Sequence, residues 1–433
     1  MKSELNPSLK ARPASTRSRS KLKVGVVGCG YWGPNLIRNF AALSDCRLHA
    51  ICDLSADRLG RIQSLYPEVQ GYSDYKRFLD QGGLDAVAIA TSVGLHHPMA
   101  LAALQAGKHV MVEKPLAAST AECTELVRTA AERQLTLMVG HTFLYSPVVR
   151  RIKQIVDAGD IGEVRYISSR RLNLGLFQKD INVAWDLAPH DLSIILYILG
   201  ELPRRVNCCG STNVSPRVQD VTSIWLGFSR NRSAIVQSSW LDPRKTREMT
   251  IVGSKRMIVY DDTAPLEKIR VFDARVDSPP HYDTFAEFQY AYHYGDIYTP
   301  YVKQEEPLRL ECQHFLDCIR TGQRPITDGT MATDVVRILE ASSRSLQLEG
   351  AAVDLEPLVR VLFTDPPVGR VAHQPPNGNR GNGHTSGNGN GNGNGNGNGN
   401  GKGNDARHRV LRGAARRIER FRQRPRTRAA ASA

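Results

Sequence analysis

The feature that most constrains this chain is a glycine-rich turn that joins a predicted β-strand to a predicted helix near the N-terminus. Residues 24–27 form a short apolar run, the turn reads Gly28-Cys29-Gly30-Tyr31-Trp32-Gly33, and residues 35–43 have a helical pattern. A G-x-G-x-x-G turn in this setting is typical of dinucleotide-binding βαβ units. The first glycine permits the tight turn, the second lets a pyrophosphate approach the backbone, and the third allows close helix–strand packing.

Asp53 indicates which dinucleotide the turn would bind. It lies 20 residues after Gly33, at the end of the next predicted strand, residues 48–52. Its carboxylate suits the adenosine ribose hydroxyls, and its negative charge disfavours a 2′-phosphate. We therefore expect NAD rather than NADP, with Arg58 facing solvent from the helix that follows. The alternative interpretation is a glycine-rich turn that binds no ligand.

Strand and helix patterns go on alternating over residues 21–142. The further predicted strands are 85–90, 109–112 and 136–139, and the predicted helices are 56–65, 98–105 and 120–133. Nearly continuous apolar strands between helices indicate a parallel sheet that is covered on both faces. The expected fold class is α/β, beginning with a doubly wound Rossmann domain that binds NAD.

A different pattern predicts a second domain, of the α+β type, over residues 143–362. Its expected helices are 147–158, one following Asp186, 308–321 and 330–348, and its expected strands are 206–210, 221–228, 234–239, 249–252, 257–260 and 269–272. Consecutive strands without helices between them favour a large, mainly antiparallel open sheet. Residues 275–305 read as an ordered loop. One broad sheet face would be exposed, so we expect this domain to bind substrate and to form a homodimer or homotetramer.

The basic residues are concentrated in two tails. Of the net charge of +14, residues 1–23 contribute +6 and residues 402–433 contribute +9, which leaves the body nearly neutral at −1. A nucleic-acid-binding domain usually carries its own basic face, so nucleic acid is not an expected partner. Residues 1–20 read as a disordered tail, and residues 363–404 as a Gly/Asn-rich flexible linker.

The last segment, residues 405–433, has the pattern of a basic amphipathic helix. Apolar residues recur at helical spacing and arginines occupy the other face. Such a helix suits an anionic membrane surface or an acidic partner, and the alternative is a solvated tail without a specific role. Vesicle binding by a chain lacking residues 402–433 would decide between them. The eight cysteines have no metal-binding spacing, so we expect reduced thiols, no metal site and a cytoplasmic protein.

Two motifs supply candidate catalytic groups. Glu113-Lys114-Pro115 ends a predicted strand, and ligands of open α/β sheets bind at the carboxyl ends of strands. Pro115 cannot continue the sheet and favours a turn, which would place Lys114 in the crevice. Asp186 and His190 are spaced i, i+4, so they share one helix face. Taken alone, His190 also fits a purely structural helix histidine.

These motifs resemble those of the Gfo/Idh/MocA oxidoreductases over roughly residues 21–360. The segments Gly30–Asn35, His141–Pro147 and Arg170–Gly175 are similar to a narrower group, the UDP-N-acetylglucosaminuronate 3-dehydrogenase-like enzymes that act on nucleotide sugars. Two positions differ from the family pattern. Thr91-Ser92 stands where Thr-Pro is common, and Ser193 stands where an aspartate is common.

The resemblance implies roles for the candidate residues. His190 would act as general base, Lys114 would stabilise the alkoxide, and Asp186 would orient His190 or bind a neighbouring hydroxyl. The implied cofactor contacts are Gly28, Gly30, Tyr31, Trp32, Gly33, Asp53, Thr91, His96, Glu113 and Lys114. His96 fits a structural role equally well.

Four side chains between the catalytic motifs are candidate substrate ligands. They are Arg170, Arg171, Asn173 and Asn182. An arginine suits bidentate contact with a phosphate or carboxylate, and the alternative is a solvated strand edge. The expected activity is NAD-dependent oxidation or reduction of a sugar, with a nucleotide sugar of polysaccharide biosynthesis as the favoured substrate. A polyol, free-sugar or diol dehydrogenase and a non-catalytic dinucleotide-binding regulator are the alternatives.

Overall fold

The computed structural model of this chain describes residues 20–178, 181–277 and 291–355. Apart from Ser20, the two predicted tails lie outside the described residues, and so does the Gly/Asn-rich linker. None of the described helices is long and apolar enough to cross a membrane.

The first part of the chain alternates strands and helices as the sequence predicts. Its elements are β1 (Leu22–Val27), α1 (Gly33–Ala42), β2 (Cys46–Cys52), α2 (Ala56–Leu65), β3 (Gln70–Tyr72), α3 (Tyr75–Gln81), β4 (Ala86–Ile89), α4 (Val93–Gln105), β5 (His109–Glu113), α5 (Thr120–Glu132) and β6 (Leu137–Gly140). The strands form a six-stranded parallel sheet in the order β3-β2-β1-β4-β5-β6. β1 and β4 are neighbours although two strands separate them in sequence. The crevice at this change of direction is where dinucleotides bind in such sheets.

The strands of this sheet, apart from the short edge strand β3, are largely buried because helices cover both faces. All four residues of β4 are buried, which explains their unbroken apolar sequence. Several helices begin where a polar side chain accepts a hydrogen bond from the first turn, as Ser55 does for α2 and Ser119 for α5. β3 and α3 are short and were not predicted.

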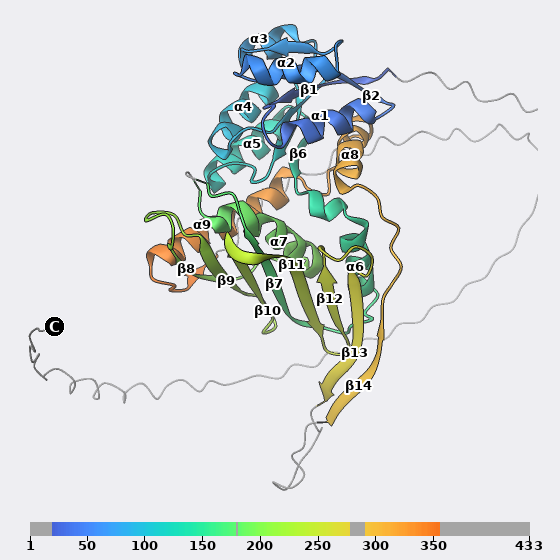
Figure 1. Ribbon diagram of the computed structural model, residues 1–433, viewed down its shortest axis with the longest axis vertical. Coiled ribbons are helices and arrows are strands. Elements are labelled where there is room, and N and C mark those ends of the chain that lie inside the picture. The colour runs from blue at the N-terminus through green and yellow to red at the C-terminus, as the bar shows by residue number, and fades with distance from the viewer. Residues whose placement is uncertain (1–19, 179–180, 278–290, 356–433) are drawn as a thin grey trace, which may run out of the picture. The chain divides into compact units, whose positions relative to one another are not determined.

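The second part begins after β6. Its elements are the 3-10 helix η1 (Thr142–Tyr145), α6 (Pro147–Asp157), β7 (Val164–Leu174), α7 (Val183–Leu199), β8 (Arg205–Ser211), β9 (Val221–Gly227), β10 (Ser233–Ser239), β11 (Leu241–Gly253), β12 (Met257–Asp261), β13 (Ile269–Asp277), β14 (Ala291–Tyr298), α8 (Pro307–Thr321), α9 (Gly329–Gln347) and β15 (Val353–Asp354). Nine strands form one sheet in the order β14-β13-β12-β11-β7-β10-β9-β8-β15. The sheet is mainly antiparallel, and β7 and β10 are its parallel pair. Figure 1 shows this sheet together with α6 and α7.

Three details of this part differ from the sequence prediction. β7 was not predicted, although it lies in the middle of the sheet. The expected loop at 275–305 is wrong in part, because it contains the end of β13 and all of β14. α7 begins before Asp186 rather than after it, and Asn182 caps its first turn by accepting a hydrogen bond from the backbone N–H of Trp185.

The last two helices complete the core of the N-terminal sheet, and α9 also packs beneath the large sheet. Leu308, Cys312 and Phe315 of α8 belong to the same buried cluster as β1 and α1. Val336 of α9 joins the cluster around α4 and α5, and Val335 of the same helix joins the core beneath the large sheet. A boundary at residue 142 therefore does not separate two independent cores, since C-terminal helices complete the core of the N-terminal sheet.

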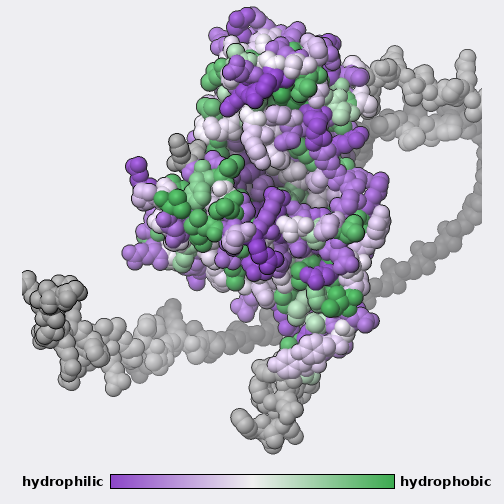
Figure 2. Space-filling view, in the orientation of Figure 1, coloured by the Kyte–Doolittle hydropathy of each residue, from purple (hydrophilic) through white to green (hydrophobic). Residues whose placement is uncertain are grey.

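The surface carries hydrophobic side chains in separate areas. In Figure 2 they gather in several places on a largely hydrophilic face, one of them over the lower end of the large sheet. Tyr166, Trp225 and Ile235 point away from the helix-covered side and are 38–40% exposed. Ile235 lies directly across from Trp225 in the β9–β10 register, so these two form adjacent apolar positions on the open face.

Candidate active site

The glycine turn has the shape that a bound pyrophosphate requires. Gly28 has a φ of +91°, and a Cβ there would lie 2.6 Å from the carbonyl oxygen of Ala90. A Cβ at Gly33 would lie 1.8 Å from the carbonyl oxygen of Gly28, so only glycine fits. A Cβ at Gly30 would meet only the Arg58 side chain, at 3.7 Å, which leaves its backbone open to a ligand. No side chain caps the start of α1, whose N–H groups therefore suit a phosphate. The turn fits NAD.

Asp53 stands at the end of β2 beside this turn. Its Oδ2 accepts a hydrogen bond from the Cys29 backbone N–H at 2.7 Å, and its Oδ1 accepts one from the Ser55 N–H at 2.8 Å. Arg58 is exposed, as expected, and its Nη1 also lies 3.6 Å from Oδ2 of Asp53. Tyr31 is exposed at the tip of the turn.

Two buried carboxyl groups lie behind the turn. The Trp32 indole N–H donates to Oε1 of Glu113 at 2.6 Å, and burial raises the pKa of Glu113 to about 7 although Lys114 opposes the shift. Glu311 on α8 is fully buried and accepts a hydrogen bond from the Thr142 hydroxyl at 2.7 Å. Burial and the nearby Glu113 raise its pKa well above the usual value. The sequence motifs gave no reason to select Glu311.

The strand-ending motif forms a rigid turn next to the cofactor crevice. The Lys114–Pro115 peptide bond is cis. His96 of α4 is buried beneath it, with Nδ1 2.7 Å from the Pro115 carbonyl oxygen and Nε2 3.1 Å from that of Thr91. His96 therefore joins the two turns that follow β4 and β5. This is the structural role considered for it, and a contact with cofactor stays a prediction.

Lys114 and Asp186 meet across the two parts of the molecule. Nζ of Lys114 donates to the backbone carbonyl of Asp186 at 2.8 Å and lies 3.6 Å from its carboxylate Oδ1. The other carboxylate oxygen accepts a hydrogen bond from the Trp240 indole at 3.0 Å. Trp240, just after β10, is almost fully buried, so it holds Asp186 in one orientation. Its role was not predicted, because it is remote in sequence from both motifs.

His190 lies one turn after Asp186 on α7, in a positively charged environment. Burial, followed by the charges of Lys114 and Arg171, lowers its pKa well below the usual value. Phe143 packs edge-on against its ring, with centroids 5.1 Å apart. Nδ1 of His190 and both ring nitrogens of His141 are buried without a hydrogen-bond partner in the described part of the chain. His190 is therefore held as a neutral imidazole, the form that accepts a proton.

The four predicted substrate ligands do not form one group. Arg170 pairs with Glu248 at 2.9 Å, and both are partly exposed. The buried Arg171 makes its bidentate contact with Asp191, through Nε at 2.6 Å and Nη2 at 3.2 Å, so it is neither a solvated edge residue nor free for a ligand. Asn182 caps α7 and donates to Gln219 at 3.2 Å, and Asn173 is half-buried in β7.

A cavity of about 320 Å³ opens beside the start of α7. Val93 and Ala118 line it from the N-terminal part, and Asn182, Trp185 and Arg217 line it from the second part. Its walls come from the start of α4, the turn that follows β5, the start of α7 and the loop between β8 and β9, and its lining residues do not include Lys114, Asp186 or His190. In the described ranges, no group of three or more His, Cys, Asp or Glu side chains is arranged to hold a metal ion.

Together, the two sheets and this site define a two-domain, NAD-binding oxidoreductase. The chain belongs to the Gfo/Idh/MocA family: residues 22–141 match the "Oxidoreductase family, NAD-binding Rossmann fold", and residues 149–259 match the "GFO/IDH/MocA C-terminal domain". The two matches together cover more than half of the chain. The N-terminal match identifies NAD as the cofactor.

The names of similar proteins refer to both sugars and polyols. The UDP-N-acetylglucosamine 3-dehydrogenase of Acidithiobacillus ferrooxidans is 29% identical over 243 residues, 55% of this chain and 74% of that protein. The myo-inositol 2-dehydrogenase of Thermotoga maritima is 24% identical over 360 residues, 78% of this chain and all of that protein. The structure of the WlbA dehydrogenase from Bordetella pertussis, in complex with NADH and UDP-GlcNAcA, has a TM-score of 0.63 and 20% identity over 78% of this chain and 99% of that one.

Proposed function

We propose that this protein is an NAD-dependent dehydrogenase that oxidises a secondary hydroxyl of a nucleotide sugar, or reduces the corresponding ketone. The observation that carries the proposal is the contact between Lys114 and Asp186, one turn from His190. It joins an ammonium group, a carboxylate and a neutral imidazole at the carboxyl ends of the parallel strands. The relatives that act on nucleotide sugars support the choice of substrate.

Each of the three groups has a role in the proposed reaction. Neutral His190 takes the proton of the sugar hydroxyl, and NAD, when bound, accepts the hydride from the same carbon. Lys114 donates a hydrogen bond to the oxygen as negative charge develops on it. Asp186, fixed by Trp240, holds the Lys114 side chain in place. In the opposite direction His190 returns the proton.

The first experiment measures oxidation of a panel of UDP- and dTDP-sugars by the wild-type enzyme with NAD, followed at the absorbance of the reduced nicotinamide. We expect Lys114→Met to lower kcat by about 10²–10³-fold, as for loss of one oxyanion-stabilising donor. We expect His190→Asn to lower it by about 10²–10⁴-fold, as for loss of a general base.

The control is Lys255→Met, which removes the same charge at an exposed position between β11 and β12. It should leave kcat unchanged. His190→Asn and Lys255→Met should still bind NAD, because neither residue is in the glycine turn or among the implied cofactor contacts. Nucleotide-sugar oxidation that survives both active-site changes would contradict the proposed mechanism, and absence of any nucleotide-sugar oxidation by the wild type would contradict the proposed substrate.

A polyol or free sugar is the second candidate substrate. The relative that acts on myo-inositol matches more of this chain than the nucleotide-sugar dehydrogenase does, at lower identity. The same assay with myo-inositol and free hexoses decides between the two. The third candidate, a non-catalytic regulator, would bind NAD but turn over none of these compounds.

The assembly is also a proposal. The open face of the large sheet, with Tyr166, Trp225 and Ile235, suits a second copy of this chain. Burying such a face in a homodimer or homotetramer removes apolar surface from water.

A further inference from the structure

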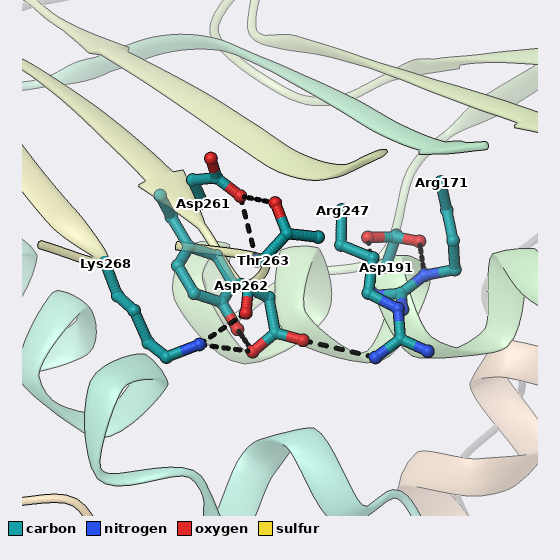
Figure 3. Close-up of polar contacts among 8 residues, drawn as sticks. Arg171, Asp191, Arg247, Asp261, Asp262, Thr263 and Lys268 are labelled. Carbon is teal, nitrogen blue, oxygen red and sulfur yellow. Dashed lines mark hydrogen bonds and ion pairs between the residues drawn. The ribbon is translucent and has the colours of Figure 1, made fainter. Parts of the chain in front are cut away.

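The inner, helix-covered face of the large sheet carries a cluster of charged side chains near His190. In Figure 3, Arg171 and Asp191 lie on one side, and Arg247, Asp262 and Lys268 lie next to them. Arg247 is directly across from Arg171 in the β7–β11 register, so the two side chains share this face. Asp191, the partner of Arg171, follows His190 in the chain, which brings the cluster to the catalytic helix.

The cluster has one more cation than it has carboxylates. Asp191 is fully used by Arg171 and by the Ser169 hydroxyl, which donates to it at 2.7 Å. Asp262 serves both Arg247, at 3.3 Å, and Lys268, at 3.5 Å. Two neighbouring carboxylates have other partners. Glu248 forms an ion pair with Arg170, and Asp261 accepts a hydrogen bond from the backbone N–H of Thr263. Three cations therefore face two carboxylates.

Arg247 is the member of the cluster that a ligand can reach. Its side chain is 38% exposed, whereas that of Arg171 is 5% exposed and that of Lys268 is 17% exposed. A guanidinium has five N–H donors, and the ion partner of Arg247 within the described residues is Asp262 alone. The charge of Arg247 also acts on His190 and helps to keep that imidazole neutral. Arg247 therefore offers free donors on the same sheet face as Arg171, whose partner Asp191 adjoins His190 in the chain.

We propose that Arg247 binds an anionic group of the substrate, a carboxylate on the sugar or the diphosphate of the nucleotide. This inference rests on the proposed function, which it refines by assigning the substrate a negative charge near the reacting carbon. The planar fork of an arginine matches two oxygens of a carboxylate or a phosphate better than the ammonium of a lysine does. The excess positive charge of the cluster is then neutralised when substrate binds, which favours anionic sugars over neutral ones.

The test uses Arg247→Gln and Arg247→Lys, with Arg244→Gln as the matched control. Arg244 is three residues earlier in β11 and exposed, and its replacement changes the net charge equally. Calorimetry on the NADH-loaded protein, which cannot oxidise the ligand, measures the affinity for four probes: UDP-GlcNAcA, UDP-GlcNAc, D-glucuronate and D-glucose. We expect Arg247→Gln to weaken anion binding by about tenfold or more, Arg247→Lys to restore part of it, and Arg244→Gln to have no effect.

The pattern over the four probes identifies the anion. If Arg247→Gln loses affinity only for UDP-GlcNAcA and D-glucuronate, the anion is a carboxylate on the sugar. If it loses affinity for both UDP-sugars and keeps its affinity for the free sugars, the anion is the diphosphate. If the affinity of Arg247→Gln changes equally for all four probes, or changes for none of them, the inference is overturned. Failure of the proposed function has a separate signature, because the wild type would then bind neither UDP-sugar while still binding and oxidising a free sugar.

Discussion

Burial of single residues shifts the pKa values of the ionisable groups around this site. His190 and His141 are held neutral, and the carboxyl groups of Glu113 and Glu311 are held partly or wholly protonated. The carboxylate of Asp186 lies beside the ammonium of Lys114. Burial therefore reduces the charge of the other ionisable groups around this ion pair.

The raised pKa of Glu113 makes a prediction about stability. Between pH 4.5 and about 7 the folded protein holds a proton on Glu113 that the unfolded chain releases. The free energy of unfolding should therefore fall as pH rises through this range, by up to about 3 kcal/mol from this group alone. Glu113→Gln keeps the acceptor for Trp32 and removes this dependence. We expect the variant to gain stability over the wild type as pH rises from 5 to 8, as measured by urea unfolding at each pH.

The exposed Glu68→Gln on the same domain is the control, and its difference from the wild type should not grow with pH to the same extent. If the free energies of unfolding of Glu113→Gln and the wild type differ by the same amount at every pH, Glu113 is ionised throughout this range.

The sequence motifs predict the candidate catalytic groups but not all the residues around them. Lys114 follows a strand end, and Asp186 and His190 share a helix face, so motif and periodicity bring them to the crevice. Arg247 could not be found in this way. Its neighbourhood depends on the register of β11 against β7, and β7 itself was not recognised.

At the scale of elements, β7 shows why the sequence pattern did not predict every strand. β7 carries Ser168-Ser169-Arg170-Arg171 in the centre of a sheet, where apolar residues are usual. Its buried polar groups are satisfied by Asp191, 20 residues later on α7. β4 and β5, in contrast, are buried on both faces and have continuous apolar sequences, so their strands were predicted correctly.

This contact between α7 and β7 should be costly to break. Asp191→Asn leaves the Arg171 charge buried without its carboxylate, and loss of one member of a buried pair costs about 3–5 kcal/mol. The matched control is Glu248→Gln, which breaks the ion pair with Arg170 on the opposite face of the same strand, where both partners are partly exposed. That change should cost less than about 1 kcal/mol. Urea unfolding compares the two, and equal losses would contradict the structural role of Asp191.

At the scale of the whole molecule, the open sheet face predicts the state of assembly. Trp225→Lys and Ile235→Asp place charges on adjacent positions of that face, without touching the core. We expect the double variant to sediment as a monomer under conditions in which the wild type sediments as a dimer or tetramer, with NAD binding retained. Leu266→Lys, at an exposed apolar position in the turn between β12 and β13, is the control. An unchanged mass in the double variant would place the contact elsewhere.

The contacts of Asp53 have a consequence for redesigning coenzyme preference. Both carboxylate oxygens already accept backbone N–H groups, one from the glycine turn and one from the start of the next helix. An asparagine has one acceptor oxygen, so replacing Asp53 by asparagine would remove one of these two hydrogen bonds together with the negative charge. Engineering this enzyme for phosphorylated NAD should therefore supply a new acceptor for the Cys29 N–H when the Asp53 charge is removed, and keep Arg58 as a cation for the phosphate.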